Sequence, residues 1–505
     1  MVRSPLVPAA MCLLLAGCST EFTPQTCATD DACGSGLVCE VRVGQPVCVA
    51  ATDAALHIGS SAPLSGPNQA LGTDMKLGMS LAFDAPNAAG GIRGRQLVLD
   101  FRDDAYDPDT AEANVRALLD VQPGTGMVKC PSTDTSVVAG QAPVSTTPLD
   151  RGPNAVLALL GNVGTPTMVL TAPVTLETGT LFFGAFTGAT PILRDTTAGP
   201  CHQYVFNVRA SYADEARAAL EYFFDLQVPD YTHILSFDQN DTYGQAGYSG
   251  LVAAYTAIKG GFTPPPADPT TPFPRFRYTR NDETTVPAQV TAAAAYLGTL
   301  LAADTANHTI GILMTDTYGP AADFITGLRQ WQYANDAQQT MLQKATRLTL
   351  DFINVSFVGP NALAARLQQA GTVAAPQGPV AYTAGVIVSQ VVPNYQSDSS
   401  DGVLAYNKAV LAAGATPSFT SLEGYIDAQI FIAGLLAHAG PFSPEPLVAG
   451  FEDLSSLSLG LGASAGFSST SHNYSKTVWG TALNASAGFQ NQYFWSEGVA
   501  LQMYQ

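Results

Sequence analysis

The chain has 505 residues, of which 46% are hydrophobic and 12% are charged, and its formal net charge is −19 at pH 7. This length predicts two or three domains, and the hydrophobic content is sufficient for a core in each. The negative charge argues against nucleic-acid binding and against electrostatic docking on anionic lipid. After the N-terminus we find no run of about 18 apolar residues, so we expect no membrane-spanning helix.

Residues 1–17 have the pattern of a signal peptide, with a positive charge at Arg3 and an apolar stretch at 6–15 that is too short to span a membrane. The stretch ends in LAGC at 15–18, which resembles the bacterial lipobox. That resemblance implies cleavage before Cys18 and a lipid on its sulfur. An ordinary cleavage site with an incidental cysteine is the alternative. We therefore expect a lipid-anchored protein of the cell envelope that faces the periplasm or the outer membrane.

A short tether leads to four clustered cysteines, which are Cys27, Cys33, Cys39 and Cys48. In an exported chain this clustering predicts two disulfides within a mini-domain at 18–53, although the sequence does not choose among the three possible pairings. Zinc binding is the alternative, but CxxC pairs and nearby histidines are absent, so we expect no metal. Cys130 and Cys201 are the other two cysteines of the mature chain after Cys18, and we expect a disulfide between them.

From residue 54 onward the pattern alternates between strands and helices, which is typical of an α/β fold. We expect strands at 56–60, 96–101, 155–160, 181–183, 204–208, 233–237, 309–314, 385–390, 476–483 and 489–495. We expect helices at 73–85, 107–119, 168–178, 212–224, 286–302, 403–413 and 421–439, and another that ends at 259. The segments 121–153 and 316–320 read as an insertion and a loop.

The stretch 160–195 contains two apolar strands, each of which ends in a loop of small residues, GNVGTPT at 161–167 and GAFTGA at 184–189. A strand–helix–strand unit brings the carboxyl ends of both strands to one edge, where ligands of open α/β sheets bind. Backbone N–H groups and hydroxyls there can hold a carboxylate, especially if Thr165 opens a helix. Tight turns that require small residues explain the spacing equally well.

Several motifs resemble the branched-chain amino-acid (Leu/Ile/Val-type) solute-binding proteins of ABC importers. They run in consistent order from residue 56 to the C-terminus: IG at 58–59, PLSG at 63–66, NAAGGIRGR at 87–95, DD at 103–104, FTGA at 186–189, FNVR at 206–209, DTYG at 241–244, SQVVP at 389–393 and SLEGY at 421–425. Each motif is weak evidence by itself, but together, in consistent order, they are strong evidence for a resemblance to this family.

The resemblance implies a type I periplasmic-binding fold, in which two doubly wound α/β lobes are joined by three hinge crossings and hold a ligand between them. The crossings are expected near 207–209, 391–394 and 467–474. Lobe one is expected to comprise 54–207 plus 394–468, and lobe two 208–391 plus 472–505.

By the same resemblance, Thr165 is expected to hold the ligand's carboxylate, together with Phe186 and Gly188 of the second loop. Tyr243 matches an aromatic residue that reaches across from lobe two. Leu71 occupies a wall position, and Tyr318 lies near another family aromatic, unless a one-residue slip puts Thr317 there.

The family also has an acidic residue that binds the ligand's ammonium, and here Asn361 stands in its place. Because an asparagine side chain carries no charge, either Glu423 or another acid substitutes, or the ligand lacks an ammonium.

We therefore expect a binding protein for a small polar ligand, an amino acid or a related carboxylate, with an ABC permease as a possible partner and neither cofactor nor enzymatic activity. A sensor or surface receptor of the same fold is the alternative. The GxSxG sequence at 462–466 matches a hydrolase nucleophile elbow, but 467–471 lacks the helical pattern that must follow an elbow. A serine hydrolase is therefore disfavoured.

Overall fold

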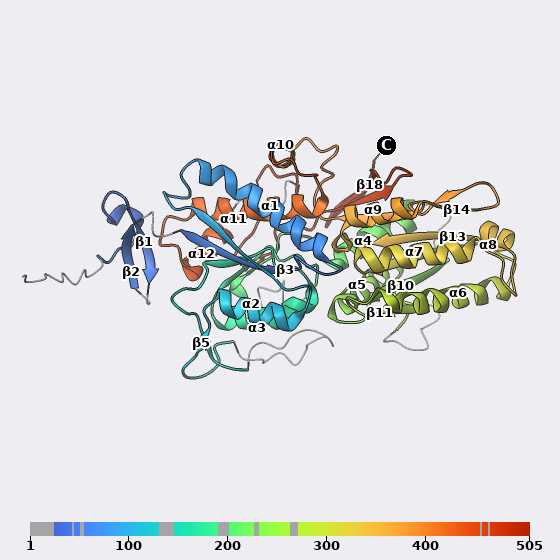
Figure 1. Ribbon diagram of the computed structural model, residues 1–505, viewed down its shortest axis with the longest axis horizontal. Helices are drawn as coiled ribbons and strands as arrows, with labels where there is room; N and C mark the ends of the chain where they lie inside the picture. Colours follow the sequence, from blue (N-terminus) through green and yellow to red (C-terminus); the bar gives the residue numbers. More distant parts are fainter. Residues whose placement is uncertain are drawn as a thin grey trace, which may run out of the picture.

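The computed structural model describes residues 25–42, 45–50, 55–130, 146–189, 201–226, 232–262, 271–454, 457–462 and 465–504. The predicted signal peptide and Cys18 lie outside these residues. A small hairpin at one end of the molecule precedes two α/β lobes (Figure 1). The hairpin pairs β1 (Leu37–Arg42) with β2 (Gln45–Ala50). The disulfides Cys27–Cys39 and Cys33–Cys48 cross-link it, so the four clustered cysteines form two disulfides as predicted.

Lobe one, as we use the term here, is the five-stranded parallel sheet with its helices. Its strand order is β4-β3-β7-β8-β9. The strands are β3 (Leu56–Ala62), β4 (Leu97–Asp103), β7 (Ala158–Leu160), β8 (Leu181–Phe183) and β9 (Val205–Phe206). The helices are α1 (Gln69–Ala88), α2 (Pro108–Leu118), α3 (Thr165–Glu177), α10 (Asp401–Ala412), α11 (Phe419–Ala437) and α12 (Pro444–Glu452). Figure 1 shows α1 and α11 on one side of this sheet and α2 and α3 on the other. Cys130 is bonded to Cys201 in this lobe.

Lobe two is the eight-stranded sheet, in the order β11-β10-β12-β13-β16-β17-β18-β19, with its helices. Its strands are β10 (His233–Gln239), β11 (Arg275–Tyr278), β12 (His308–Thr315), β13 (Leu348–Asn354), β16 (Val386–Gln390), β17 (Val478–Leu483), β18 (Phe489–Ser496) and β19 (Val499–Met503). Its helices are α4 (Tyr212–Glu221), α5 (Thr242–Lys259), α6 (Val286–Ala303), α7 (Tyr318–Gln332), α8 (Met341–Arg347) and α9 (Pro360–Ala370). Short pairs are formed by β5 (Gln122–Pro123) with β6 (Leu149–Asp150) and by β14 (Thr372–Val373) with β15 (Val380–Ala381).

Local chemistry explains where several helices begin. Asp107 caps α2 by accepting a hydrogen bond from the Thr110 amide at 2.9 Å, and Pro108 occupies the first helical position. The prediction of a loop at 316–320 is wrong for 318–320, because α7 begins at Tyr318 after an extended Thr317. The strand expected at 155–160 is limited to β7.

One surface helix is more apolar than the sequence reading allowed. The stretch Glu283–Ala303, which contains α6, has a mean hydropathy of 1.3 and is long enough to cross a membrane. Among the described residues it is the one helix that meets this criterion of length and composition. α6 packs against β11 and α7, as expected for a helix of an α/β layer, and the expected absence of a membrane-spanning helix stays a prediction.

Two of the passages between the lobes run side by side, one around residue 207 and the other at 472–474. Asn207 donates its amide to the His472 carbonyl and accepts from the Tyr474 amide, both at 2.8 Å. A third passage follows β16, whose strand lies in lobe two while α10 packs against α1 in lobe one. The residue boundaries given above for the two lobes stay a prediction.

Two glycines allow the closest helix contact of lobe one. A Cβ atom on Gly78 of α1 would lie 1.9 Å from the Ser421 carbonyl oxygen of α11, and one on Gly424 would lie 2.6 Å from the Met75 carbonyl oxygen. Any side chain at these positions would force the two helices apart.

We therefore expect Gly78→Ala to destabilise the protein by about 1–3 kcal/mol, because a rigid backbone atom has to move. Gly298→Ala in α6 is the matched control, since a Cβ there meets no atom within 4 Å. The control is expected to gain about 0.5–1 kcal/mol from better helix propensity. Urea unfolding followed by circular dichroism measures both changes, and equal stability of the two variants would refute the close contact.

Candidate ligand-binding site

Two loops of lobe one meet at the start of α3. Thr165 is the first residue of that helix, and its Oγ1 lies 2.7 Å from Oγ1 of Thr187 in the loop after β8. Main-chain bonds tie the loops together, from the Gly164 amide to the Phe186 carbonyl at 3.1 Å and from the Phe186 amide to the Asn162 carbonyl at 2.8 Å. The structure thus places a pair of hydroxyls beside a helix N-terminus, where an anion is favoured.

Buried aromatic rings fill the space next to these hydroxyls. The ring of Phe357 lies 4.9 Å from that of Phe186, 4.7 Å from that of Tyr243 and 6.2 Å from that of Tyr106. Tyr243 in turn lies 5.5 Å from Tyr212. Phe186 and Tyr106 belong to lobe one, whereas the other three belong to lobe two, so the rings join the lobes.

Two of the loop glycines are required by these rings. A Cβ on Gly188 would lie 2.5 Å from the Tyr212 ring, and one on Gly164 would lie 2.3 Å from the Tyr106 ring. Gly164 also has a φ of 105°, which favours glycine. Gly188 therefore contributes by making room for Tyr212.

A buried arginine lies against this aromatic cluster. The Arg209 guanidinium is 4.8 Å from the centre of the Phe186 ring. It pairs with Glu215 of α4 at 3.4 Å and with Glu423 of α11 at 3.3 Å, and it donates to the Ser356 hydroxyl. Burial alone lowers the pKa of Arg209, but the charges of Glu423 and Glu215 outweigh it and raise that pKa. The Glu423 carboxylate is thus engaged by a cation of the protein.

The remaining predicted residues also lie where the two lobes meet. Leu71 and Tyr318 both approach Gly359, since a Cβ there would lie 2.8 Å from Leu71 Cδ2 and 3.1 Å from Tyr318 Cδ1. Tyr318 donates its hydroxyl to the Pro67 carbonyl of lobe one. Asn361 donates to the Tyr395 hydroxyl at 2.8 Å and accepts from the Phe419 amide at 3.1 Å, so it holds the start of α11.

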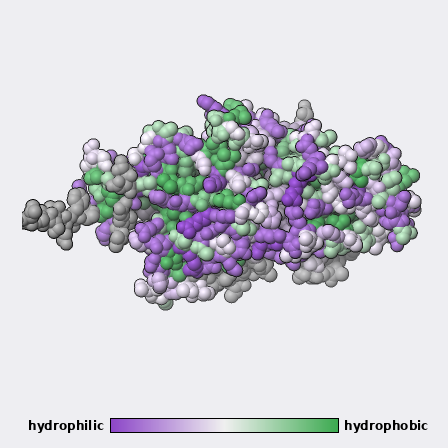
Figure 2. Space-filling model, viewed as in Figure 1, coloured by the Kyte–Doolittle hydropathy of each residue, from purple (hydrophilic) through white to green (hydrophobic). Residues whose placement is uncertain are grey.

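The structure therefore brings Thr165, Phe186, Gly188 and Tyr243 into one cluster, which we call the interlobe cluster together with Tyr106, Thr187, Arg209, Tyr212 and Phe357. Sequence reasoning named Thr187 and Arg209 only within motifs and did not single out Tyr106, Tyr212 or Phe357. A positive φ of 62° at Tyr106 marks its unusual turn, but the sequence gives no sign of that. On the face in Figure 2 hydrophilic residues cover much of the middle of the molecule, whereas the cluster is buried.

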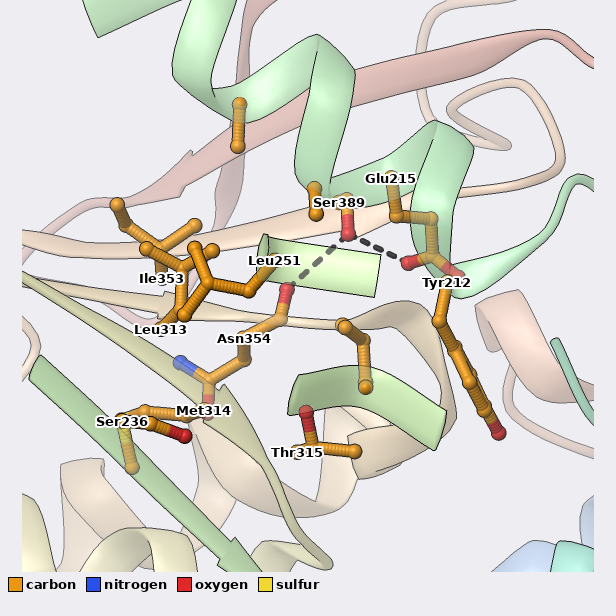
Figure 3. Close-up of a pocket in the computed structure, with 14 residues that line it drawn as sticks. Tyr212, Glu215, Ser236, Leu251, Leu313, Met314, Thr315, Ile353, Asn354 and Ser389 are labelled. Atoms are coloured by element: carbon orange, nitrogen blue, oxygen red, sulfur yellow. Dashed lines mark hydrogen bonds between the residues drawn. The ribbon is translucent and has the colours of Figure 1, made fainter. Parts of the chain in front are cut away.

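One cavity adjoins the cluster at Tyr212, and another lies apart from it. The pocket in Figure 3 measures about 10 Å³, enough for one water molecule, and lies inside lobe two. Leu251, Leu313 and Ile353 gather at one end of it, and at the other Ser389 donates to Glu215 at 2.5 Å. A larger cavity of about 490 Å³ lies in lobe one beside the Cys130–Cys201 disulfide.

Comparisons with known proteins agree with this architecture. A family model described as periplasmic binding protein matches residues 55–148. The Leu/Ile/Val-binding protein homolog 3 of Brucella melitensis is 47% identical over 53 residues, which are 10% of this chain and 14% of that protein. The matched segment thus spans about a seventh of the length of that relative.

Solved structures cover far more of the chain. A possible leucine/isoleucine/valine-binding protein from Rhodopirellula baltica is 27% identical with a TM-score of 0.64, covering 88% of this chain and 97% of that one. A branched chain amino acid ABC transporter protein from Thermus thermophilus with bound valine is 12% identical with a TM-score of 0.59, covering 88% and 97%. The type I periplasmic-binding fold and the resemblance to the branched-chain amino-acid binding proteins are thereby confirmed.

Proposed function

We propose that this chain, with its type I periplasmic-binding fold, is an extracytoplasmic solute-binding protein that captures a small carboxylate, an amino acid or a related compound, between its lobes for an ABC importer. The observation that carries the proposal is the pair of hydroxyls on Thr165 and Thr187 at the N-terminus of α3, facing aromatic rings from the other lobe. Two structural neighbours, a leucine binding protein from Thermotoga maritima and the Thermus thermophilus protein with bound valine, support the ligand class.

The hydroxyls and the helix N-terminus supply oriented donors, so a carboxylate can be held without a basic side chain of its own. Arg209 does not serve this purpose, because Glu215 and Glu423 already balance its charge. Thr165 is 3% exposed and Tyr243 is fully buried, so a ligand can reach them only when the lobes separate. Separation breaks contacts such as the hydrogen bond between Asn68 and Asn281 at 2.8 Å.

Closure of the lobes then completes the site. In this account the carboxylate binds to lobe one first, and Tyr243 and its neighbours cover the ligand when lobe two closes over it. A sensor or receptor of the same fold would bind its ligand in the same way and differ only in its partner. Permease and ATPase genes beside its own gene would support import.

We further propose that the mature protein is held at the membrane by lipid on Cys18. The LAGC sequence at 15–18 supports this, and the Cys-rich hairpin then stands between the anchor and lobe one. Arg95 of lobe one pairs with Glu40 of the hairpin at 3.2 Å, which limits how the hairpin is oriented.

Thr165→Val is expected to weaken binding of the ligand roughly ten- to a hundredfold, since a hydrogen bond to a charged group contributes about 1.5–3 kcal/mol. Isothermal titration calorimetry against the solute that native mass spectrometry finds in the purified protein measures the change. Thr171→Val is the matched control, because Thr171 lies in the same helix and its buried hydroxyl has no hydrogen-bond partner. Equal affinity of the Thr165 variant and wild type would show that the site is placed wrongly.

Cys18→Ala is expected to move the protein from the membrane fraction to the soluble fraction of the envelope, because acyl chains rather than a helix provide the attachment. Cys12→Ala, within the predicted signal peptide, is the control and should leave fractionation unchanged. Retention of the Cys18 variant on membranes after salt and carbonate washing would contradict the anchor.

A further inference from the structure

One buried carboxyl group lies next to the interlobe cluster without any partner. Asp316 follows β12 directly and precedes Thr317, the residue before α7. Its side chain is fully buried, and among the residues that the structure describes neither of its carboxyl oxygens has a hydrogen-bond partner. Among the described residues no ion pair involving Asp316 is formed. A buried carboxyl group without hydrogen bonds is costly, so its presence calls for an explanation.

Two tyrosine hydroxyls bond to the main chain at Asp316 and Thr317. The Tyr243 hydroxyl donates to the main-chain carbonyl of Asp316 at 2.8 Å, and the Tyr278 hydroxyl accepts from the Thr317 amide at 3.2 Å. Burial, and then the charge of Asp316 among other groups, raises the pKa of both tyrosines well above its usual value. The carboxyl group is therefore close enough to both hydroxyls to act on them.

The two basic side chains of β11 pair with a different carboxylate. Arg275 and Arg277 pair with the neighbouring Asp238 at 2.7 and 3.2 Å. Burial first, and then the charge of Asp238, raises the pKa of Asp316 well above its usual value. Both effects disfavour the charged form of Asp316. A cation brought beside it would favour that form.

Another buried carboxyl group, that of Asp427, differs in its surroundings. It too has no hydrogen-bond partner among the described residues, and burial and then the charge of Glu423 raise its pKa well above its usual value, but the positive charge of Arg209 offsets part of this rise. No cation of the described residues lowers the pKa of Asp316 in this way. The two other candidates for binding a cationic group are occupied as well, since Glu423 pairs with Arg209 and Asn361 holds the start of α11.

A continuous series of contacts connects Asp316 with the proposed carboxylate site. Thr187 Oγ1, which touches Thr165, lies 3.4 Å from the Tyr212 hydroxyl. The Tyr212 ring packs on Tyr243, and the Tyr243 hydroxyl donates to the main-chain carbonyl of Asp316. Two aromatic side chains thus stand between the hydroxyl pair and the main chain of Asp316. A ligand that touched both ends would carry its opposite charges well apart.

We propose that Asp316 binds the distal cationic group of an elongated carboxylate ligand, such as lysine, arginine or another ω-amino acid, with Tyr243 and Tyr278 as its aromatic neighbours. This inference rests on the proposed function, because the hydroxyl pair has to hold the other end. The tyrosine rings favour a cation near their faces, and the carboxylate supplies the opposite charge. A branched aliphatic side chain would leave the acid unsatisfied.

The test compares two probes that differ only in the distal cation, 6-aminohexanoate and hexanoate, by isothermal titration calorimetry on the full mature chain. We expect 6-aminohexanoate to bind at least roughly tenfold more tightly, as a charged hydrogen bond allows. Asp316→Asn, which keeps the shape of a protonated carboxyl, should reduce its affinity to that of hexanoate. Asp323→Asn, an exposed residue of α7, is the control and should leave both affinities unchanged.

A second readout is specific to the acid. Because a bound cation favours the charged form of Asp316, wild type should release protons on binding 6-aminohexanoate and none on binding hexanoate. Heats measured in buffers of different ionisation enthalpy report the number of protons released, and Asp316→Asn should abolish the release. The titratable groups that face Asp316 are Asp238, Tyr243 and Tyr278. Burial raises the pKa of both tyrosines well above its usual value, so they contribute no proton near neutral pH.

The outcomes separate this inference from the proposed function. Equal binding of the two probes, or unchanged 6-aminohexanoate binding in Asp316→Asn, overturns the role of Asp316. Binding of valine that requires Thr165, without binding of either probe, also overturns it and leaves the proposed function standing. If none of these carboxylates binds, the proposed function itself fails. The wild-type comparison needs no variant, so a folding defect does not obscure it.

Discussion

The buried guanidinium of Arg209 is the charge on which the arrangement of both lobes depends. It lies at a crossing between them and pairs with Glu215 of lobe two and with Glu423 of lobe one. Removing one partner from a buried ion pair typically costs about 3–5 kcal/mol, because the other charge stays buried. The crossing, α4 and α11 are therefore held in one arrangement, and the loops that carry the site are fixed relative to them.

Glu215 extends this network into the segment that carries Phe357. Its carboxylate accepts from the Ser356 amide at 2.6 Å and from the Ser389 hydroxyl at 2.5 Å. Phe357 is thereby placed against Phe186 and Tyr243. Since Phe186 also lies under Arg209, the ion-pair network and the aromatic rings act together. Separation of the lobes has to disturb both.

The parts of the fold that depend on local pattern could be predicted from the sequence. The loops of Gly and Thr after two apolar strands were expected at one edge of the sheet, and Asp107-Pro108 gave the start of α2. The helix between the loops was expected at 168–178, whereas α3 begins at Thr165. The start of α7 at Tyr318 was missed, because Asp316 and Thr317 read as a turn and the helix has no capping side-chain hydrogen bond.

The contacts made between lobes could not be predicted in the same way. Tyr106 and Phe357 are far apart in the chain and meet only in the folded protein, and nothing around either residue signals the contact. Glu423 and Asn361 looked available because their partners, Arg209 and the Phe419 amide, come from other elements. The same reason hid Asp316, whose lack of a partner is a property of the tertiary structure.

The central claim is that ligand binds between the lobes, and hydrogen–deuterium exchange tests it most directly. The protein is compared with and without a mixture of the common amino acids. The account predicts slower exchange at the start of α3, in the loop of Phe186 and at the start of α5, which belong to different lobes. Protection confined to the residues around the 490 Å³ cavity, such as Lys129 and Tyr204, would contradict it.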